Sequence, residues 1–291
     1  MPELPEVEVV RLRLVEAHCN REISEVRTTK NNYAFLTPPA QLRRHLLGHR
    51  FTAIVRQGKY LLFSLDDNSR LMVHLGMTGQ LFSSRAVSPR LVNKQSRAQT
   101  ARSRLGLFVP DKHTHLSLVF ADTGEQLHFR DSRKFGKLLW LAPGLTDKRL
   151  ERLGADALSI TAQTLANGLA NRRICIKTLL LDQSVLAGVG NIYADEALHR
   201  AKLAPHRPAQ SLTSEEVRRL TATIRKVLTR AIALGGSTID DYVHPDGSDG
   251  QFQNSFSVYG RAGQPCLRCQ NAIVRVVIGQ RSAHYCPGCQ A

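Results

Sequence analysis

The pattern of hydrophobic and polar residues divides the chain into a short helical start, a strand-rich stretch and a helical second half. Near the start, Val7, Val10 and Leu14 share one face of a helix, and Pro5 suits its first turn. Short apolar runs then alternate with turns, at 60–65, 71–75, 116–120 and 137–141. Several short strands with little helix between them predict an antiparallel β-sandwich.

The second half carries a clear helix signal. Thr213 and Glu216 have the spacing of a capping box, and the helix that they open is expected to end at Gly235-Gly236. Its apolar stripe consists of Val217, Leu220, Ile224, Val227 and Ala231. Another helix is expected at 192–200, after a glycine turn in which Asn191 could cap the helix or bind a phosphate. Such a turn is also common without any ligand.

One stretch, residues 84–104, interrupts the strand pattern. It has no acidic residue, and its basic residues are Arg85, Arg90, Lys94, Arg97, Arg102 and Arg104. Charge alone is enough to attract phosphate, so the stretch is either a DNA-contacting loop or a solvated insertion without a role. The sequence leaves both interpretations open.

The charge balance narrows the class of partner. The 291 residues include 40 lysines and arginines against 24 aspartates and glutamates, a formal net charge of +16. A globular protein this basic usually binds a polyanion, although ribosome association or a merely basic surface gives the same sign. The N-terminus is acidic and unlike a signal peptide, and no apolar run approaches the roughly 18 residues of a membrane span. We therefore expect a soluble, cytoplasmic protein that does not associate with membranes.

Four of the six cysteines form two C-x-x-C pairs near the C-terminus, separated by sixteen residues. Four thiolates at this spacing can surround a tetrahedral Zn²⁺, whereas a redox dithiol rarely comes doubled in one ribbon. Such a site has no open coordination position, so the metal is expected to be structural. The predicted ligands are Cys266, Cys269, Cys286 and Cys289, and the residues between the pairs are expected to form a hairpin with Arg281 at its turn.

The first residues offer a possible nucleophile. Pro2 is small enough to permit removal of Met1, which would expose a secondary amine. An α-amino group titrates at about pH 8. Attack of that amine on an aldehyde-level carbon gives an iminium, which makes elimination at the neighbouring carbon easier. Glu3 could act as general acid beside it. Taken alone, the segment is better explained as a proline and some acids at a helix start.

Further motifs supply the missing context. They are MPELPEVE from Met1, GKY from Gly58, HLGMTG from His74, DSRKFG from Asp131, GVGNIY from Gly188 and the four-cysteine ribbon. With these motifs in this order, the chain resembles the bacterial formamidopyrimidine-DNA glycosylases from its first residue to its last. The resemblance implies a base-excision-repair enzyme for double-stranded damaged DNA, which excises 8-oxoguanine and formamidopyrimidines and then cleaves the strand by β- and δ-elimination.

The resemblance also assigns roles to residues. It implies Pro2 as Schiff-base nucleophile after removal of Met1, and Glu3 as proton donor to the opening sugar, with Glu6 ordering this end of the site. It implies Lys59 and Arg281 as proton donors for β- and δ-elimination. The DNA contacts that it implies are His74, Met77, Arg133, Phe135, Asn191 and Arg281. Met77, Arg133 and Phe135 would fill the gap left by the extruded nucleotide and restore part of the lost stacking.

The fold that the resemblance implies is α+β. It consists of a β-sandwich domain with flanking helices over 1–143, a linker over 144–160, a helix-two-turn-helix domain over 161–256 and a zinc ribbon over 257–291. We expect a monomer, one structural Zn²⁺, and no nucleotide cofactor. The segment 246–254 resembles the loop that covers the flipped base, but its sequence assigns no base contacts. The stretch 84–104 is longer than the loop expected there, and Lys134 stands where arginine is also common.

The nearest alternative is an endonuclease VIII-type enzyme that acts on oxidised pyrimidines. That relative shares Pro2, Glu3 and the ribbon, but it usually has glycine at the position of Leu4. The full set of Met77, Arg133 and Phe135 favours the enzyme for purines. A zinc-ribbon DNA binder without activity is a more distant alternative.

Overall fold

The computed structural model describes residues 1–30, 32–88, 108–239 and 242–291. It contains two compact units, one formed by Met1–Asp147 and Gly235–Gln251, the other by Lys148–Leu234 and Phe252–Ala291. The chain thus returns to the first unit at 235–251, within the stretch 161–256 that was predicted as one helical domain. Most of the basic stretch 84–104 lies outside the described residues.

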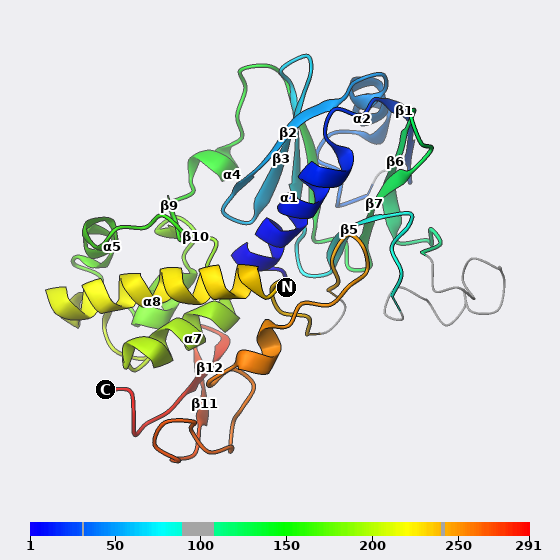
Figure 1. Cartoon of the computed structure of the whole chain (residues 1–291). Coiled ribbons are helices and arrows are strands. Elements are labelled where there is room, and N and C mark those ends of the chain that lie inside the picture. Colours follow the sequence, from blue (N-terminus) through cyan, green and yellow to red (C-terminus); the bar gives the residue numbers. More distant parts are fainter. Residues whose placement is uncertain (31, 89–107, 240–241) are drawn as a thin grey trace. The chain divides into compact units, whose positions relative to one another are not determined.

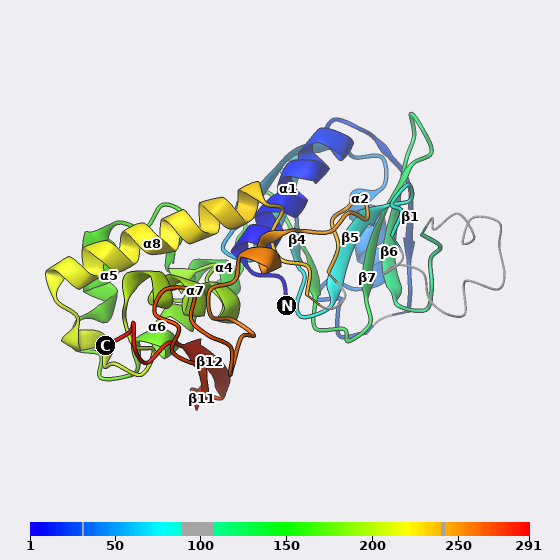
Figure 2. The same ribbon diagram turned by 60° about the horizontal axis from the view of Figure 1, so that its bottom comes forward.

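The first unit contains two four-stranded antiparallel sheets, which confirms the predicted sandwich. One sheet has the order β2 (Phe51–Gln57), β3 (Tyr60–Leu65), β4 (Arg70–His74) and β8 (Lys137–Leu141). The other has the order β1 (Ile23–Thr28), β6 (Thr114–Phe120), β7 (Gln126–Asp131) and β5 (Gly79–Ser83), which lie in a row in Figure 2.

The core of this unit lies between the sheets because alternate residues of each strand point inward. Phe63, Leu71, Leu118 and Phe129 are among these buried residues. Helix α1 (Leu4–His18) packs against β2 and β3 and buries the predicted stripe of Val7, Val10 and Leu14, while α2 (Pro39–Leu46) packs against β1 and β8 (Figure 1). The sandwich is thus covered by helices, as the predicted class requires.

Two connections cross from one sheet to the other at the same end of the sandwich. His74 at the end of β4 pairs with Lys137 at the start of β8, and Gly79 at the start of β5 pairs with Asp131 at the end of β7. The β4–β5 and β7–β8 turns therefore lie side by side. Gly76 (φ +62°) fits there because it has no side chain: a Cβ would lie 2.5 Å from the backbone of Phe135 and Gly136.

The second unit is mostly helical. Its helices and short strands are α4 (Lys148–Glu151), β9 (Ala155–Asp156), α5 (Ala162–Leu169), α6 (Ile176–Leu181), β10 (Leu186–Ala187), α7 (Asn191–Ala201), η2 (Ala209–Ser211), α8 (Ser214–Ala233) and η3 (Phe252–Ser255). The stretch predicted as a linker, 144–160, contains α4 and β9, and β9 pairs in parallel with β10. The hairpin of β11 (Val274–Ile278) and β12 (Arg281–Tyr285) confirms the predicted ribbon.

Helix α8 begins and ends where its sequence predicts. The Thr213 hydroxyl accepts the Glu216 amide at 3.3 Å, and the Glu216 carboxylate accepts the Thr213 amide at 2.9 Å. Gly235 and Gly236, with φ of +76° and +73°, follow the helix in left-handed conformations that favour glycine. Within the described ranges, none of the helices has the length and apolar character needed to cross a membrane.

Candidate active site and DNA-binding surface

The N-terminal residues are held inside the first unit by one carboxylate. Pro2, Glu3 and Glu6 are buried. The Glu6 side chain accepts the Glu3 amide at 2.8 Å and the Ser237 amide at 2.7 Å, and the Tyr242 hydroxyl donates to the Glu6 carbonyl at 3.0 Å. Glu6 therefore ties the start of α1 to the returning segment 235–251, which we call the return segment.

A second link joins α1 to the turn that carries Lys59. Arg56 donates to the Glu8 carboxylate at 2.8 Å and to the Gly58 carbonyl at 3.0 Å. Burial raises the pKa of Glu8, but hydrogen bonds from Arg11 and Arg56 outweigh it, so the net pKa is lowered and the carboxylate is charged at neutral pH. Lys59 is itself buried, with 8% of its surface exposed, in the two-residue turn between β2 and β3.

His74 lies at the same sheet end as Lys59. Its partner in the β3–β4 register is Tyr60, and the two ring centroids are 4.7 Å apart. Burial, together with the charges of Lys59 and Lys137, lowers the pKa of His74 to about 4, so the ring is neutral at physiological pH. Its Nδ1 accepts the Gly76 amide at 3.1 Å, which leaves Nε2 as the N–H donor of this tautomer.

The two crossing turns present Met77, Arg133 and Phe135 to solvent. Met77 is 39% and Phe135 50% exposed, and the Arg133 guanidinium lies 4.9 Å from the Phe135 ring centroid. Single exposed apolar residues are common, but two of them with an arginine on adjoining turns form a surface suited to stacking. The structure thus brings Arg133 and Phe135 together beside the turn of Met77, and their role toward DNA stays a prediction of the family resemblance.

One buried residue organises both turns. Asp131 is fully buried and accepts the Thr78 hydroxyl at 2.5 Å, the Arg133 amide at 3.2 Å and the Gly136 amide at 2.7 Å. A carboxylate without these donors would be costly to bury, so the turn geometry and the charge stabilise each other. No separate role was predicted for Asp131 from the sequence, although its position before a turn of polar residues was a usable signal.

In the second unit, Asn191 and the ribbon lie together. Asn191 is the first residue of α7, whose cap is Gly190, so Asn191 does not cap the helix as one prediction allowed. Its Nδ2 lies 3.4 Å from the Ser282 hydroxyl, and among the described atoms its buried Oδ1 has no hydrogen-bond partner. Arg281 precedes Ser282 and is exposed at the hairpin turn. The structure therefore brings Asn191 and Arg281 to neighbouring positions.

A fully buried ion pair fixes this arrangement. Lys177 on α6 donates to Asp195 on α7 at 2.6 Å and also to the Ser282 carbonyl, and neither side chain is exposed. The other Asp195 oxygen accepts the His284 amide at 2.9 Å. Lys177 and Asp195 were not predicted from the sequence, although each is a charged residue within an apolar helical run. That pattern is a usable signal because charges are rarely buried without a partner.

Glu196, next on α7, holds the chain that leads into the ribbon. Its buried carboxylate accepts three successive backbone amides, those of Ser257, Val258 and Tyr259, at 2.9–3.0 Å. Successive amides that converge on one carboxylate form an anion-binding nest. Helix α7 therefore holds the ribbon segment through two adjacent acidic residues.

The four predicted metal ligands converge at the base of the ribbon. Their sulfur atoms all lie within 4.8 Å of one another, with 3.8 Å between Cys266 and Cys289 and 3.4 Å between Cys269 and Cys286. Zn–S bonds of about 2.3 Å place tetrahedral thiolates about 3.8 Å apart, whereas disulfide sulfurs are about 2.05 Å apart. The donor set and spacing fit one structural Zn²⁺ held by Cys266, Cys269, Cys286 and Cys289.

Comparisons with known proteins agree over the whole chain. Residues 1–138 match the N-terminal domain of formamidopyrimidine-DNA glycosylase, residues 153–243 its H2TH domain, and residues 263–291 a zinc finger found in FPG and IleRS. The formamidopyrimidine-DNA glycosylase of Laribacter hongkongensis is 39% identical over 100% of both chains. That of Thermus thermophilus is 41% identical over 100% of this chain and 98% of its own.

Solved structures show the same similarity. The crystal structure of the Fpg protein from Thermus thermophilus has a TM-score of 0.82 and 39% identity, and covers 99% of this chain and 98% of its own. The Fpg protein of Lactococcus lactis in complex with DNA that contains FAPY-dG has a TM-score of 0.82 and 33% identity, with 99% of each chain covered. The chain therefore belongs to the formamidopyrimidine-DNA glycosylase family of base-excision-repair enzymes.

Proposed function

We propose that this protein excises oxidised purines from duplex DNA and then cleaves the strand, with the secondary amine of Pro2 as nucleophile once Met1 has been removed. The observation that carries this proposal is the way the N-terminus is held. Pro2 and Glu3 are buried, Glu6 accepts the Glu3 amide, and the Glu8–Arg56–Gly58 link joins α1 to the turn of Lys59. A catalytic amine needs such fixed placement.

In the first step, the Pro2 nitrogen attacks C1′ of the damaged nucleoside as the bond from C1′ to the base breaks. Glu3 protonates the ring oxygen of the opening sugar, and the nitrogen that remains bound to C1′ becomes an iminium. The iminium withdraws electrons, so a proton is lost from C2′ and the 3′ phosphate departs. Elimination of the 5′ phosphate follows. We assign proton donation in these two steps to Lys59 and Arg281.

The remaining predicted residues would hold extruded DNA. C1′ is accessible to the amine only when the nucleotide leaves the stack, which costs a few kcal/mol of stacking. Met77, Arg133 and Phe135 are exposed on the crossing turns and would occupy the vacated space. His74, Asn191 and Arg281 would hold backbone phosphates. The ion pair of Lys177 with Asp195 supports this role for Arg281 because it fixes the ribbon strand that follows it.

Borohydride trapping tests the proposal. The protein is incubated with a duplex that holds 8-oxoguanine opposite cytosine, and borohydride reduces any iminium to a stable protein–DNA adduct. We expect an adduct whose DNA-linked peptide begins at Pro2. Protein that retains Met1 should bind the duplex but form no adduct. No adduct from processed protein would end the lyase proposal. Trapping with Met1 retained would exclude Pro2 as nucleophile, and the DNA-linked peptide would then identify a lysine or the Met1 amine.

The same assay decides between the two classes of oxidised base. One structure of the Lactococcus lactis enzyme, 33% identical to this chain, is described as a complex with DNA containing an oxidised pyrimidine. A duplex with an oxidised pyrimidine is therefore the second substrate in the assay. Faster trapping with 8-oxoguanine supports the purine preference that we propose, and an adduct only with the pyrimidine would favour the endonuclease VIII-type alternative.

A further inference from the structure

The return segment contains a turn, residues 244–248, that is organised by one aspartate. Asp246 accepts the Ser248 amide at 3.0 Å and the Ser248 hydroxyl at 2.7 Å, and its second oxygen pairs with Arg13 on α1. His244 and Ser248 also exchange a backbone hydrogen bond of 2.9 Å. Such an aspartate turn is a rigid local structure because the side chain replaces a backbone acceptor.

The turn is packed against the beginning of the basic insertion. We call residues 83–88 and Phe108 the insertion stem. The Ser83 amide donates to the Pro245 carbonyl at 2.9 Å, and the Val87 amide donates to the Asp246 carbonyl at 3.1 Å. At Gly247 (φ +89°) a Cβ would lie 2.4 Å from the Val87 carbonyl oxygen. The turn thus fits the stem closely through backbone contacts.

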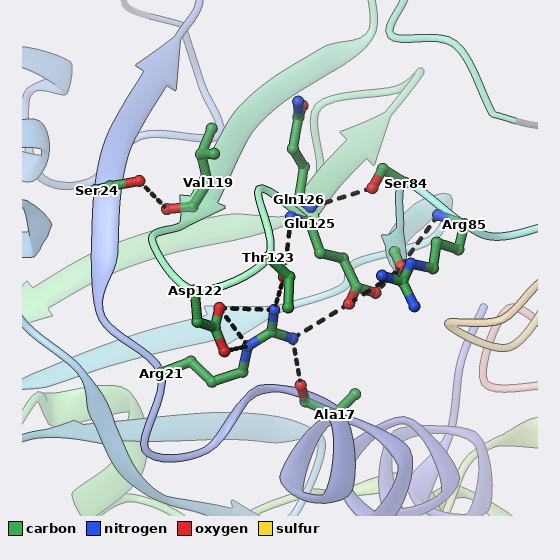
Figure 3. Close-up of polar contacts among 11 residues, drawn as sticks. Ala17, Arg21, Ser24, Ser84, Arg85, Val119, Asp122, Thr123, Glu125 and Gln126 are labelled. Carbon is green, nitrogen blue, oxygen red and sulfur yellow. Dashed lines mark hydrogen bonds and ion pairs between the residues drawn. The ribbon is translucent and has the colours of Figure 1, made fainter.

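The insertion stem is fixed on its other side by Glu125 at the β6–β7 turn. The Glu125 carboxylate accepts the Ser83 hydroxyl and pairs with Arg21 at 3.2 Å and with Arg85 at 3.9 Å (Figure 3). The amide of Ser84 donates to the Gln126 carbonyl at 2.8 Å. Phe82, Ala86 and Phe108 of this region form a small buried cluster with Val243 of the return segment. These contacts fix the insertion stem to the β6–β7 turn of the sandwich, so the stem holds the turn 244–248 in place.

The turn is also connected to the N-terminal site. The His244 ring lies 2.5 Å from the Gly235 carbonyl, so the turn and the start of the return segment are joined directly. At Gly236, a Cβ would lie 2.9 Å from the Glu6 carboxylate, and the next amide, that of Ser237, donates to the same carboxylate. Glu6 in turn accepts the amide of Glu3. Described contacts therefore run from Asp246 to the residue beside Pro2.

We propose that Asp246 is a positioning residue for the N-terminal site: it orders the turn 244–248, which packs on the insertion stem, and thereby holds Glu6 and Glu3 in place. Asp246 acts through these residues and does not touch the reacting atoms. The inference rests on the proposed Pro2 chemistry for its effect on rate. Its structural part, the ordering of the Glu3 and Ser237 amides, stands apart from that chemistry.

The test compares four variants in single-turnover borohydride trapping with a saturating excess of enzyme over abasic-site duplex. We expect Asp246→Ala to trap at least tenfold more slowly, because the oxygen that accepts both hydrogen bonds of the turn is lost. Gly247→Ala should have a similar effect through the clash with Val87. Asp246→Asn keeps one side-chain oxygen and should stay within about threefold of wild type, since an exposed ion pair contributes little. Glu25→Ala removes an exposed partner of Arg27 and serves as matched control.

Two further measurements separate positioning from other roles. Affinity for a duplex with a tetrahydrofuran abasic analogue should change less than threefold in Asp246→Ala, so that the loss is in rate. Hydrogen exchange at the Glu3 and Ser237 amides should accelerate in Asp246→Ala and Gly247→Ala, but not in Glu25→Ala. Unchanged exchange, an unchanged trapping rate, or a loss of affinity as large as the loss of rate would each overturn the proposal. If wild-type protein forms no adduct, the Pro2 chemistry fails, and hydrogen exchange still decides the positioning role.

Discussion

The two units hold the side chains that we propose to bind DNA by different means. In the first unit, the turns of Met77, Arg133 and Phe135 depend on Asp131, whose partners are a hydroxyl and backbone amides. In the second unit, Asn191 and Arg281 depend on a ribbon that is held by the Lys177–Asp195 ion pair and by four cysteines suited to Zn²⁺. One arrangement uses neutral donors around a carboxylate, and the other uses opposite full charges.

The difference has an energetic consequence. A carboxylate surrounded by amides loses its donors only if the turn itself rearranges, so damage stays local. A buried ion pair leaves an uncompensated charge when either partner is removed. The ribbon depends on its metal in the same way, because it unfolds when the metal is lost. The second unit should therefore respond more strongly to single substitutions than the first. The following predictions test that order.

Loss of the metal should have the largest effect. Cys286→Ser removes one of four thiolates, and metal binding to structural zinc fingers is worth about 10–16 kcal/mol. We expect the purified variant to lack zinc and its affinity for abasic-site duplex to fall more than a hundredfold, because Arg281 loses its support. Metal analysis and fluorescence anisotropy measure the two effects. Cys19→Ser, in the first unit, is the control and should keep zinc. One equivalent of zinc in Cys286→Ser would contradict a four-thiolate site.

Removal of one partner of the buried ion pair should rank second. Lys177→Met leaves the Asp195 charge unpaired in a fully buried site, which typically costs about 3–5 kcal/mol. The midpoint of urea unfolding should fall accordingly. The double variant Lys177→Met with Asp195→Asn removes both charges and should recover part of the loss. Arg27→Gln, which breaks an exposed pair with Glu25, provides the comparison and should leave the midpoint unchanged. A double variant less stable than Lys177→Met would disprove charge burial as the cause.

Substitution of Asp131 should have a smaller and more local effect on stability. Asp131→Ala leaves the Thr78 hydroxyl and the amides of Arg133 and Gly136 without this acceptor, and an unsatisfied buried donor costs about 1–3 kcal/mol. We expect DNA affinity to fall about tenfold through disorder of the turns that carry Met77, Arg133 and Phe135, and zinc content to stay at one equivalent. Asp131→Asn retains one acceptor oxygen, so its DNA affinity should lie between those of Asp131→Ala and wild type. Affinity equal to wild type in Asp131→Ala would show that the turns need no such support.

A pH effect at His18 comes last because it is absent near neutral pH, where the other variants are compared. Burial lowers the pKa of His18 to about 4, and its ring stacks on Phe120 at 4.8 Å. Between that value and about 6.5, the unfolded chain binds a proton that the folded protein does not. The contribution of His18 to stability is thus complete above about pH 6.5 and is lost as the pH falls toward 4, by at most about 3 kcal/mol.

The comparison of His18→Phe with wild type isolates this effect. Urea unfolding is measured for both proteins at pH 7.5 and pH 5.0. Wild type should lose more stability than the variant over this interval, since phenylalanine cannot be protonated. His74 and other buried histidines contribute equally to both proteins and cancel in the difference. Parallel losses in the two proteins would mean that His18 is not buried in its neutral form.

The return segment shows why part of the site was beyond prediction from sequence. The helix stop at Gly235-Gly236 follows from local chemistry and was predicted. What comes next, the hydrogen bond of the Ser237 amide to Glu6, joins residues 231 positions apart. The stretch 161–256 therefore reads as one helical domain in sequence, whereas 235–251 packs in the first unit. No local pattern distinguishes an amide that will bond within its own turn from one that will meet a distant carboxylate.

The sequence by itself determined those features in which neighbouring residues are sufficient partners. These are the capping box of Thr213 and Glu216, the alternation of the sandwich strands, and the two C-x-x-C pairs whose spacing sets a metal geometry. The order of the sequence motifs also identified the family that the chain resembles. The capping box and each C-x-x-C pair close within a few residues, so their geometry is encoded by spacing.

Only the tertiary structure decided how buried charges find their partners. Lys177 with Asp195, Asp131 beneath the two crossing turns, and Glu6 between Glu3 and Ser237 each depend on the topology that brings separate elements together. The physical reason is desolvation: a charge leaves water only where the fold supplies donors or an opposite charge, and that supply comes from distant parts of the chain. The N-terminal proline was visible in the sequence, but the contacts that hold it in place were not.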